Sequence, residues 1–408
     1  MKSLRHLFRL GPGPSSSHTI GPYRAAKRFR ELIEPFEVDK IRVTFYGSLA
    51  LTGIGHASNK AIRSALFSYE IEEVFDCKTT PPHPLTMDFE AFQGGESVKK
   101  CRYFSLGGGE ISSEDDPEVN EKDIYPFGTI EEAKTIMKEK GLSSIKELCL
   151  CFEDPSIDDY LMEVLKEMLK SVSLGLQKSG PIPSNSNPRL ALRRSAKEVY
   201  ESAKAIGHHD GKKEILLTAY AYAVAESNAC GETIVTAPTC GSSGVLPACL
   251  YYLHKQRHVP LVLLRDSLYV AGIFGNVVKT NASIAGSVGG CQAEIGTASS
   301  MAAAALSSAA GLSMYQIEYA AECAMEHFLG LSCDPVDGYV IIPCIERNGI
   351  GALRASAAYL YARHISPVRR NQVRFDDVVT AMKLTGESLS SDIKETAEGG
   401  LAKILRCN

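Results

Sequence analysis

Three cysteines lie beside loops and have the residue type that binds soft metal centres. Cys291 stands in GGCQAEIG, Cys333 in SCDPVDG and Cys344 in IPCIERNG. Their spacings of 42 and 11 residues match neither the paired CxxC knuckles of a zinc ribbon nor the close cysteine run of a ferredoxin. From spacing alone, metal binding and ordinary packing both stay open. A fourth cysteine, Cys407, is the penultimate residue and is either a ligand or part of a frayed tail.

Histidines supply a second kind of chemistry, since an imidazole titrates near neutral pH and can remove a proton from a weak acid. Three of the ten histidines occur in loops rich in serine, glycine or proline: His18 in SSSHT, His56 in GIGHAS and His83 in PPHPL. A single histidine is more often structural than catalytic. Three in separate loops of this kind favour a functional role.

A run of three serines precedes the first of these histidines. Ser15, Ser16 and Ser17 follow GPGP and come before a helical pattern. Hydroxyl and N–H groups at such a position either cap the helix or hold an anion such as a carboxylate. The chain has no GxxxxGK[ST] motif, so a phosphate-binding loop is disfavoured.

Two patterns of secondary structure must position these residues. The first part mixes strand and helix periodicities, with strands expected at 40–46 and 98–106 and helices at 58–69, 130–140 and 156–170. After a stretch dense in proline, serine and asparagine, helical patterns rich in alanine and leucine follow at 189–206, 212–229, 298–312, 315–329 and 351–363. We therefore expect an α+β domain at 1–178, a linker at 179–188 and an all-α domain at 189–408.

The composition excludes several classes of protein. With 44% hydrophobic and 23% charged residues the chain is typical of a globular protein, and its net charge of -4 gives no long-range attraction to nucleic acid or anionic lipid. No apolar run has the length of a signal peptide core or of a membrane span. Twelve cysteines without a secretion signal indicate a reducing compartment. We expect a cytoplasmic protein that binds neither nucleic acid nor membrane.

Long motifs along nearly the whole chain point to one family. They are GPGPSSSHTIGP (11–22), FYGSLALTGIGHASNKA (45–61), HPLTMDF (83–89), SLGGGE (105–110), TAPTCGSSGVLPA (236–248), NASIAGSVGGCQAEIG (281–296), CDPVDGYVIIPCIERN (333–348) and KETAEGGLA (394–402). With these motifs the chain resembles the iron-sulfur-dependent L-serine dehydratase (L-serine ammonia-lyase) family, in a form that fuses the α+β and helical parts. The resemblance implies conversion of L-serine to pyruvate and ammonia without pyridoxal phosphate.

The resemblance also implies a cofactor and its ligands. Cys291, Cys333 and Cys344 are expected to bind three irons of a 4Fe-4S cluster in the all-α domain, leaving the fourth iron open as a Lewis acid for the serine β-hydroxyl. Cys407 is expected to be the resting ligand of that open iron, displaced by substrate. Cys240 stands where many family members have asparagine, and we expect it not to be a ligand. A homodimer is expected from the family.

The remaining site residues are also assigned through the family motifs. Elimination needs a base for the α-proton, and we expect His56 and His83 to be this base or its partner. Because the cysteines and the histidines come from different domains, the site should lie at the domain interface. Contacts to L-serine or the cluster are expected from Ser15, Ser16, Ser17, His18, Thr239, Gly241, Ser242, Asn281, Ser283, Arg347 and Lys394.

Two alternatives stay open at this stage. One is a lyase of the same kind acting on threonine or cysteine, because one methyl group beside the β-carbon changes binding by only about 1–3 kcal/mol. The other is a non-catalytic sensor that holds a labile cluster; the intact histidine and serine loops favour an enzyme. A pyridoxal-phosphate enzyme would need a Schiff-base lysine and a phosphate loop, which the motifs do not indicate.

Overall fold

The N-terminal part is built on one five-stranded sheet. The structure, a computed structural model, describes residues 1–206 and 211–406. The sheet has the order β3-β2-β4-β5-β6, and β2 is parallel to β3 while the other neighbours are antiparallel. Its strands are β2 (Lys40–Tyr46), β3 (Glu70–Asp76), β4 (Thr86–Gln93), β5 (Glu96–Gly107) and β6 (Glu110–Ser112). The strands predicted at 40–46 and 98–106 are confirmed.

One face of this sheet is covered by helices. Alternate residues of β2, among them Ile41, Val43 and Phe45, are fully buried, as the alternating sequence KIRVTFY requires. They pack with Phe29 of α1 and Ile62 of α3 in a separate hydrophobic cluster. The helices of this part are α1 (Gly21–Ile33), α2 (Gly47–Thr52) and α3 (Ser58–Ala65).

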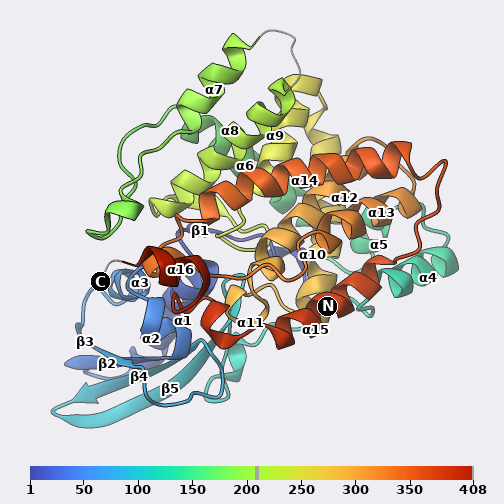
Figure 1. Ribbon diagram of the computed structural model, residues 1–408. Helices are drawn as coiled ribbons and strands as arrows, with labels where there is room; N and C mark the ends of the chain where they lie inside the picture. The colour runs from blue at the N-terminus through green and yellow to red at the C-terminus, as the bar shows by residue number, and fades with distance from the viewer. Residues whose placement is uncertain (207–210, 407–408) are drawn as a thin grey trace.

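The rest of the chain is mainly helical, as expected. Figure 1 shows these helices at one end of the molecule and the sheet at the other. The helices are α4 (Ile130–Lys140), α5 (Ile145–Leu150), α6 (Ile157–Gly175), α7 (Ala196–Ala205), α8 (Lys212–Ala229), α9 (Val245–Arg257), α10 (Leu261–Asn281), α11 (Gly286–Gly289), α12 (Thr297–Ala309), α13 (Met314–Glu326), α14 (Cys344–His364), α15 (Phe375–Ser388) and α16 (Gly400–Leu405). Short 3-10 or π-helical turns occur at Leu4–His6, Ser16–Ile20, Pro117–Val119, Pro188–Leu190, Gln292–Gly296, Val336–Gly338 and Ser391–Ile393.

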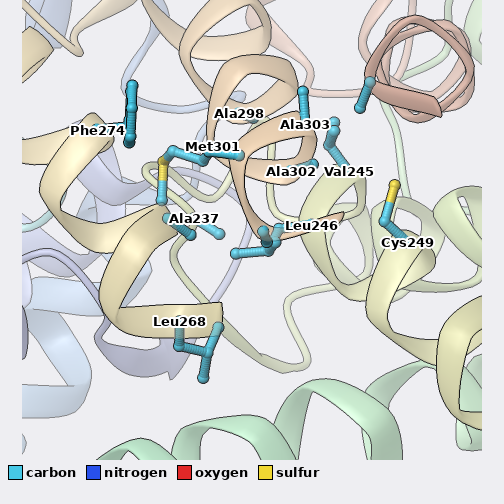
Figure 2. Packing of buried hydrophobic residues seen from close by; sticks show 14 of the residues in the cluster. Ala237, Val245, Leu246, Cys249, Leu268, Phe274, Ala298, Met301, Ala302 and Ala303 are labelled. Carbon is cyan, nitrogen blue, oxygen red and sulfur yellow. The ribbon is translucent and has the colours of Figure 1, made fainter. Parts of the chain in front are cut away.

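A large core of close-packed small side chains holds the helices together. Ala298, Met301 and Ala302 of α12 are fully buried, and Figure 2 shows them among residues of α9 and α10. Alanine lets helix backbones approach closely, which explains why this half is so rich in it. Helices α4–α6 belong to the same core. The sheet core is formed by residues between Ala25 and Ile111, and the helical core by residues from Tyr125 on together with the N-terminal residues Met1–Phe8 and Ile20. The linker at 179–188 stays a prediction.

Contrary to the expectation from the sequence, helix α10 has the length and composition of a membrane span, but its environment is that of a core helix. It has 21 residues and a mean hydropathy of 1.5 in its most apolar window, and 72% of that window is buried inside the protein. A continuous apolar sequence is expected of any helix buried on all sides. The helix therefore gives no indication of membrane insertion.

A small second sheet joins the N-terminal loop to the helical half. Strand β1 (Leu10–Pro12) pairs antiparallel with β7 (Thr233–Val235). Among the described residues after 178, β7 is the only β-strand. The side-chain amide of Asn228 also donates to the carbonyl of Pro14 at 2.7 Å. These bonds fix the serine-rich loop against the helical half.

Candidate active site

Loops from both halves of the chain meet around a small cavity. It encloses about 10 Å³, roughly the space of one water molecule. The N-terminal part contributes Ser15 and His56, and the helical part contributes Cys291, Glu294, Cys333, Cys344 and Glu395. Cysteines and histidines that lie far apart in the sequence thus line one cavity.

Each of the three predicted cysteine ligands is held at the boundary of an element. Cys291 directly precedes the π-helical turn Gln292–Gly296, and Cys344 is the first residue of α14. Cys333 lies in a short parallel bridge with Lys394: its N–H donates to Ile393 O at 2.8 Å, and the Glu395 N–H donates to its carbonyl at 2.7 Å. Both Cys291 and Cys333 are 4% exposed.

The electrostatics around the three sulfurs suit a thiolate-bound metal group. A hydrogen bond from Cys333, aided by the Arg347 guanidinium, lowers the pKa of Cys291 to about 6 despite burial. The same hydrogen bond and burial raise the pKa of Cys333 well above its usual value, and burial raises that of Cys344. Three soft donors converge beside one cation, which is the donor chemistry of an iron-sulfur centre.

The backbone beside the sulfurs leaves no room for a side chain. A Cβ added to Gly286 would lie 2.8 Å from Cys333 Sγ and 3.1 Å from Glu294 Oε2. Glycine at this position therefore allows the sulfur to face the cavity. The fourth predicted ligand, Cys407, lies outside the described residues, so its assignment stays a prediction.

His56 and His18 stack on each other beside the cavity, and their hydrogen bonds define their tautomers. The ring centroids are 4.3 Å apart. Nδ1 of His56 lies 3.0 Å from Thr52 O, and because a carbonyl only accepts, Nδ1 carries the proton and Nε2 has a free lone pair. Burial lowers the pKa of His56 to about 4. His56 is therefore a neutral ring with a free nitrogen at neutral pH.

His18 is fixed in the opposite tautomer. Its Nε2 lies 2.9 Å from Ser48 Oγ, whose own proton is donated to Glu395 O at 2.8 Å. Nε2 of His18 therefore donates, and Nδ1 accepts from Ser17 Oγ at 2.9 Å. Burial, followed by the neighbouring His56, lowers the pKa of His18 well below its usual value. Both rings are thus neutral and fully constrained.

Glu395 lies beside both histidines and faces the free Nε2 of His56. Its Oε1 lies 3.4 Å from His18 Nδ1 and 3.7 Å from His56 Nε2, and its buried Oε2 has no hydrogen-bond partner among residues 1–206 and 211–406. Burial and the nearby Glu294 and Cys291 raise the Glu395 pKa well above its usual value. Its backbone is left-handed, with φ of 61°, a strained conformation often found at functional sites.

The serine-rich loop presents unused donors at the same place. Ser15 Oγ accepts from the His18 N–H at 3.1 Å, and the Ser15 N–H donates to Thr19 Oγ1 at 3.1 Å. Among the described residues, the N–H groups of Ser16 and Ser17 have no hydrogen-bond partner. Two free N–H groups at the start of a continuous helical stretch can accept an anion.

The structure places the other predicted residues in two groups. Thr239 and Ser242 are buried and joined by a 3.0 Å hydrogen bond, and Gly241 lines the cavity next to Glu294. Away from the cavity lining, Asn281 donates to Gly128 O at 2.6 Å, and the Ser283 hydroxyl accepts from Ala285 N at 3.0 Å. These two contacts are local to the chain fold.

The two predicted cations take different positions. Arg347 donates to Ser332 O at 2.8 Å and to Asp334 Oδ1 at 3.1 Å, so it is fixed beside Cys333 and faces the thiols. Lys394 pairs with Cys333 through its backbone.

His83 is separate from the stacked pair. Its Nδ1 accepts from Leu85 N at 3.1 Å, and it is not among the residues that line the cavity. Its role as base or partner stays a prediction, without the shared contacts that link His18 and His56.

Two acidic residues of the site were not singled out from the sequence. Glu294, whose pKa burial raises to about 8, and Glu395 both line the cavity. Each lies inside a motif that already contains a predicted site residue, GGCQAEIG and KETAEGG. That proximity in the sequence was the available signal.

Comparison with known proteins assigns the chain to a family. Residues 3–79 match the family model for the serine dehydratase beta chain, and residues 90–402 match that for the serine dehydratase alpha chain. The two matched regions meet within the N-terminal sheet, well before the linker predicted at 179–188.

Full-length relatives agree. An L-serine dehydratase of Streptomyces coelicolor is 37% identical over 99% of both chains. An L-serine dehydratase of Helicobacter pylori is 34% identical over 99% of both, and L-serine dehydratase 1 of Escherichia coli is 35% identical over 100% of both. The chain therefore belongs to the serine dehydratase family, with its alpha-chain and beta-chain regions fused in one polypeptide.

Proposed function

We propose that this chain is an iron-sulfur L-serine ammonia-lyase that converts L-serine to pyruvate and ammonia. The observation that carries the proposal is the single cavity in which three cysteine thiols face a neutral histidine with a free nitrogen. Relatives that match over their full length are named L-serine dehydratases, which supports the same reaction.

Cys291, Cys333 and Cys344 would hold the cluster. When bound, a 4Fe-4S cluster with one iron free of protein ligands supplies a Lewis acid for the β-hydroxyl of serine. Arg347 offsets the negative charge of the thiolates, since its guanidinium is fixed by Ser332 and Asp334 beside them. Cys407 is kept as the proposed resting ligand.

His56 is the group best placed to remove the α-proton. A base must be unprotonated before reaction, and burial keeps the His56 ring neutral down to about pH 4. The bond to Thr52 O directs the basic Nε2 towards Glu395 and the cavity. Glu395, whose pKa is raised well above its usual value chiefly by burial, lies where it can exchange a proton with that nitrogen.

The substrate carboxylate would bind at the free N–H groups of Ser16 and Ser17. These donors have no other partner among the described residues, and the Ser15 side chain beside them is held by His18. An anion placed there lies at the start of the helical stretch that continues into α1, where the peptide dipoles favour negative charge. Thr239, Ser242 and Gly241 would close the opposite side.

The choice between the two predicted bases is tested by matched substitutions. His56→Gln should lower kcat by about 100- to 10,000-fold, the usual contribution of a general base, with iron and sulfide content unchanged. His83→Gln is the control, because that ring lies outside the cavity lining, and it should cost less than tenfold. Equal losses of kcat in the two variants would show that a position in the cavity lining does not identify the base.

Substrate choice, location and assembly belong to the same proposal. L-serine should be preferred over L-threonine, because the full-length relatives are named L-serine dehydratases and one extra methyl group at the β-carbon can change binding by about 1–3 kcal/mol. We also propose that the protein acts in the cytoplasm as a homodimer. Turnover of L-serine, L-threonine and L-cysteine tests the substrate preference, and light scattering tests the mass in solution. Full cluster content without turnover of any of the three amino acids would favour a sensor.

A further inference from the structure

A second cavity lies at the far end of the helical half from the cysteines. Helix α14 begins at Cys344 and ends at His364, so its length of 21 residues spans about 30 Å. Figure 1 shows it crossing the helical part. The cavity has a volume of about 320 Å³, and its walls come from α8, α9, α12 and α14. This volume is within the usual range for small-molecule sites, about 300–1,000 Å³.

The charged side chains of this cavity all have the same sign. Lys213, Arg257 and Arg363 line it together with His364, and no carboxylate does so among the described residues. Within that part of the chain, none of the four is in an ion pair with an acidic side chain; Arg363 donates to the Tyr359 hydroxyl at 2.6 Å, and the Lys213 ammonium lies over the Tyr252 ring. Burial lowers the pKa of Lys213; Cys249 and Glu214 act against this shift, and the positive charge of Arg257 adds to it. Like charges that converge without a carboxylate partner suit an anion.

The rest of the lining is mainly apolar, and it includes one serine. Leu217, Leu253 and Leu306 line the cavity together with the rings of Tyr252 and Tyr359. Ser356 lines the same cavity and is 6% exposed, and its hydroxyl forms no hydrogen bond with any described residue. The hydroxyl is therefore available to a ligand. A ligand with an acceptor group would satisfy it.

We propose that this cavity is a binding site for a small organic anion, in which a carboxylate or phosphate is attached to an aromatic or aliphatic body. The anionic group contacts Arg257, Arg363 and Lys213, since guanidinium and ammonium groups are the common partners of both anions. The body packs on the leucines and tyrosines. The site is separate from the cysteine cavity and does not depend on the reaction assigned to it.

The test uses 1-anilinonaphthalene-8-sulfonate as a probe of the same chemistry, an anion on an aromatic body. We expect one probe molecule per chain and weaker binding at higher salt. Arg257→Gln with Arg363→Gln should weaken binding at least tenfold, because both residues are exposed at the rim and can change without loss of fold. Lys138→Gln with Lys140→Gln removes the same charge from exposed positions of α4 and should have little effect.

Competition then identifies the anionic group. Displacement of the probe by phenyl phosphate assigns a phosphate ligand, and displacement by benzoate assigns a carboxylate. The proposal is overturned if neither competes, if both double variants lose binding equally, or if the uncharged N-phenyl-1-naphthylamine binds as tightly as the probe. Thermal unfolding of each variant shows that the fold is retained.

Discussion

Replacing Gly286 with alanine should prevent cluster binding without unfolding the protein. The added Cβ would lie 2.8 Å from Cys333 Sγ, and ordinary contact begins near 3.4 Å, so the sulfur must move by about 0.6 Å. Metal-ligand distances tolerate deviations of only about 0.2 Å. The sulfur has little other space, because the new methyl group also lies 3.1 Å from Glu294 Oε2 and 3.4 Å from Cys333 Cβ.

The assay is iron and sulfide per chain after anaerobic reconstitution, with far-UV circular dichroism as a check on folding. Gly241→Ala is the matched control, because Gly241 lines the same cavity and an added Cβ there would meet its nearest neighbour, Glu294 Oε1, at an ordinary 3.5 Å. We expect Gly286→Ala to bind little iron and Gly241→Ala to bind the wild-type amount. Normal iron content in Gly286→Ala would refute the argument that Cys333 is a sterically confined ligand.

Three further predictions follow from the site. Cys291→Ala, Cys333→Ala and Cys344→Ala should each lose the cluster, while Cys240→Ala keeps it. The iron content of each variant tests this, and equal loss of iron in all four would mean that the ligands are wrongly assigned. Glu395→Gln keeps the backbone hydrogen bond to Cys333 and changes only the carboxyl group that faces the histidines. We expect kcat to fall about 100-fold at constant iron content, and an unchanged kcat would exclude a role of Glu395 in proton transfer. Burial lowers the His56 pKa from 6.5 to about 4, so as the pH falls the unfolded chain takes up the proton before the folded chain does. The free energy of unfolding should therefore fall by about 3 kcal/mol in total between about pH 6.5 and pH 4. Urea unfolding of His56→Gln should depend less on pH between 8 and 5 than that of the wild type, and parallel profiles would contradict this.

Local sequence patterns predicted the elements well where periodicity was strong. The alternation of Lys40–Tyr46 gave a strand with the same bounds, and the pattern at 212–229 gave α8 with the same bounds. Strand β7 was missed because it has only three residues, too few for a periodic signal, and is formed by pairing with β1. Tertiary pairing of this kind leaves little trace in the local sequence.

The site was predictable where residue type alone indicates chemistry. Cysteines and histidines stood out, and the structure gathers His18, His56 and Cys291 at one place. Glu395 was missed because acidic residues are common and usually solvated, so its burial is visible only in three dimensions. His83 had the same local signal as His56, but it bonds to its own loop instead of the cavity, a difference that the sequence could not show.

The most direct test of the central claim is pyruvate formation from L-serine by anaerobically purified, iron-reconstituted protein, with iron and sulfide measured on the same sample. We predict turnover with about four irons and four sulfides per chain, the content of one 4Fe-4S cluster, and loss of both turnover and iron after exposure to air. Full activity in protein that contains no iron would contradict the account.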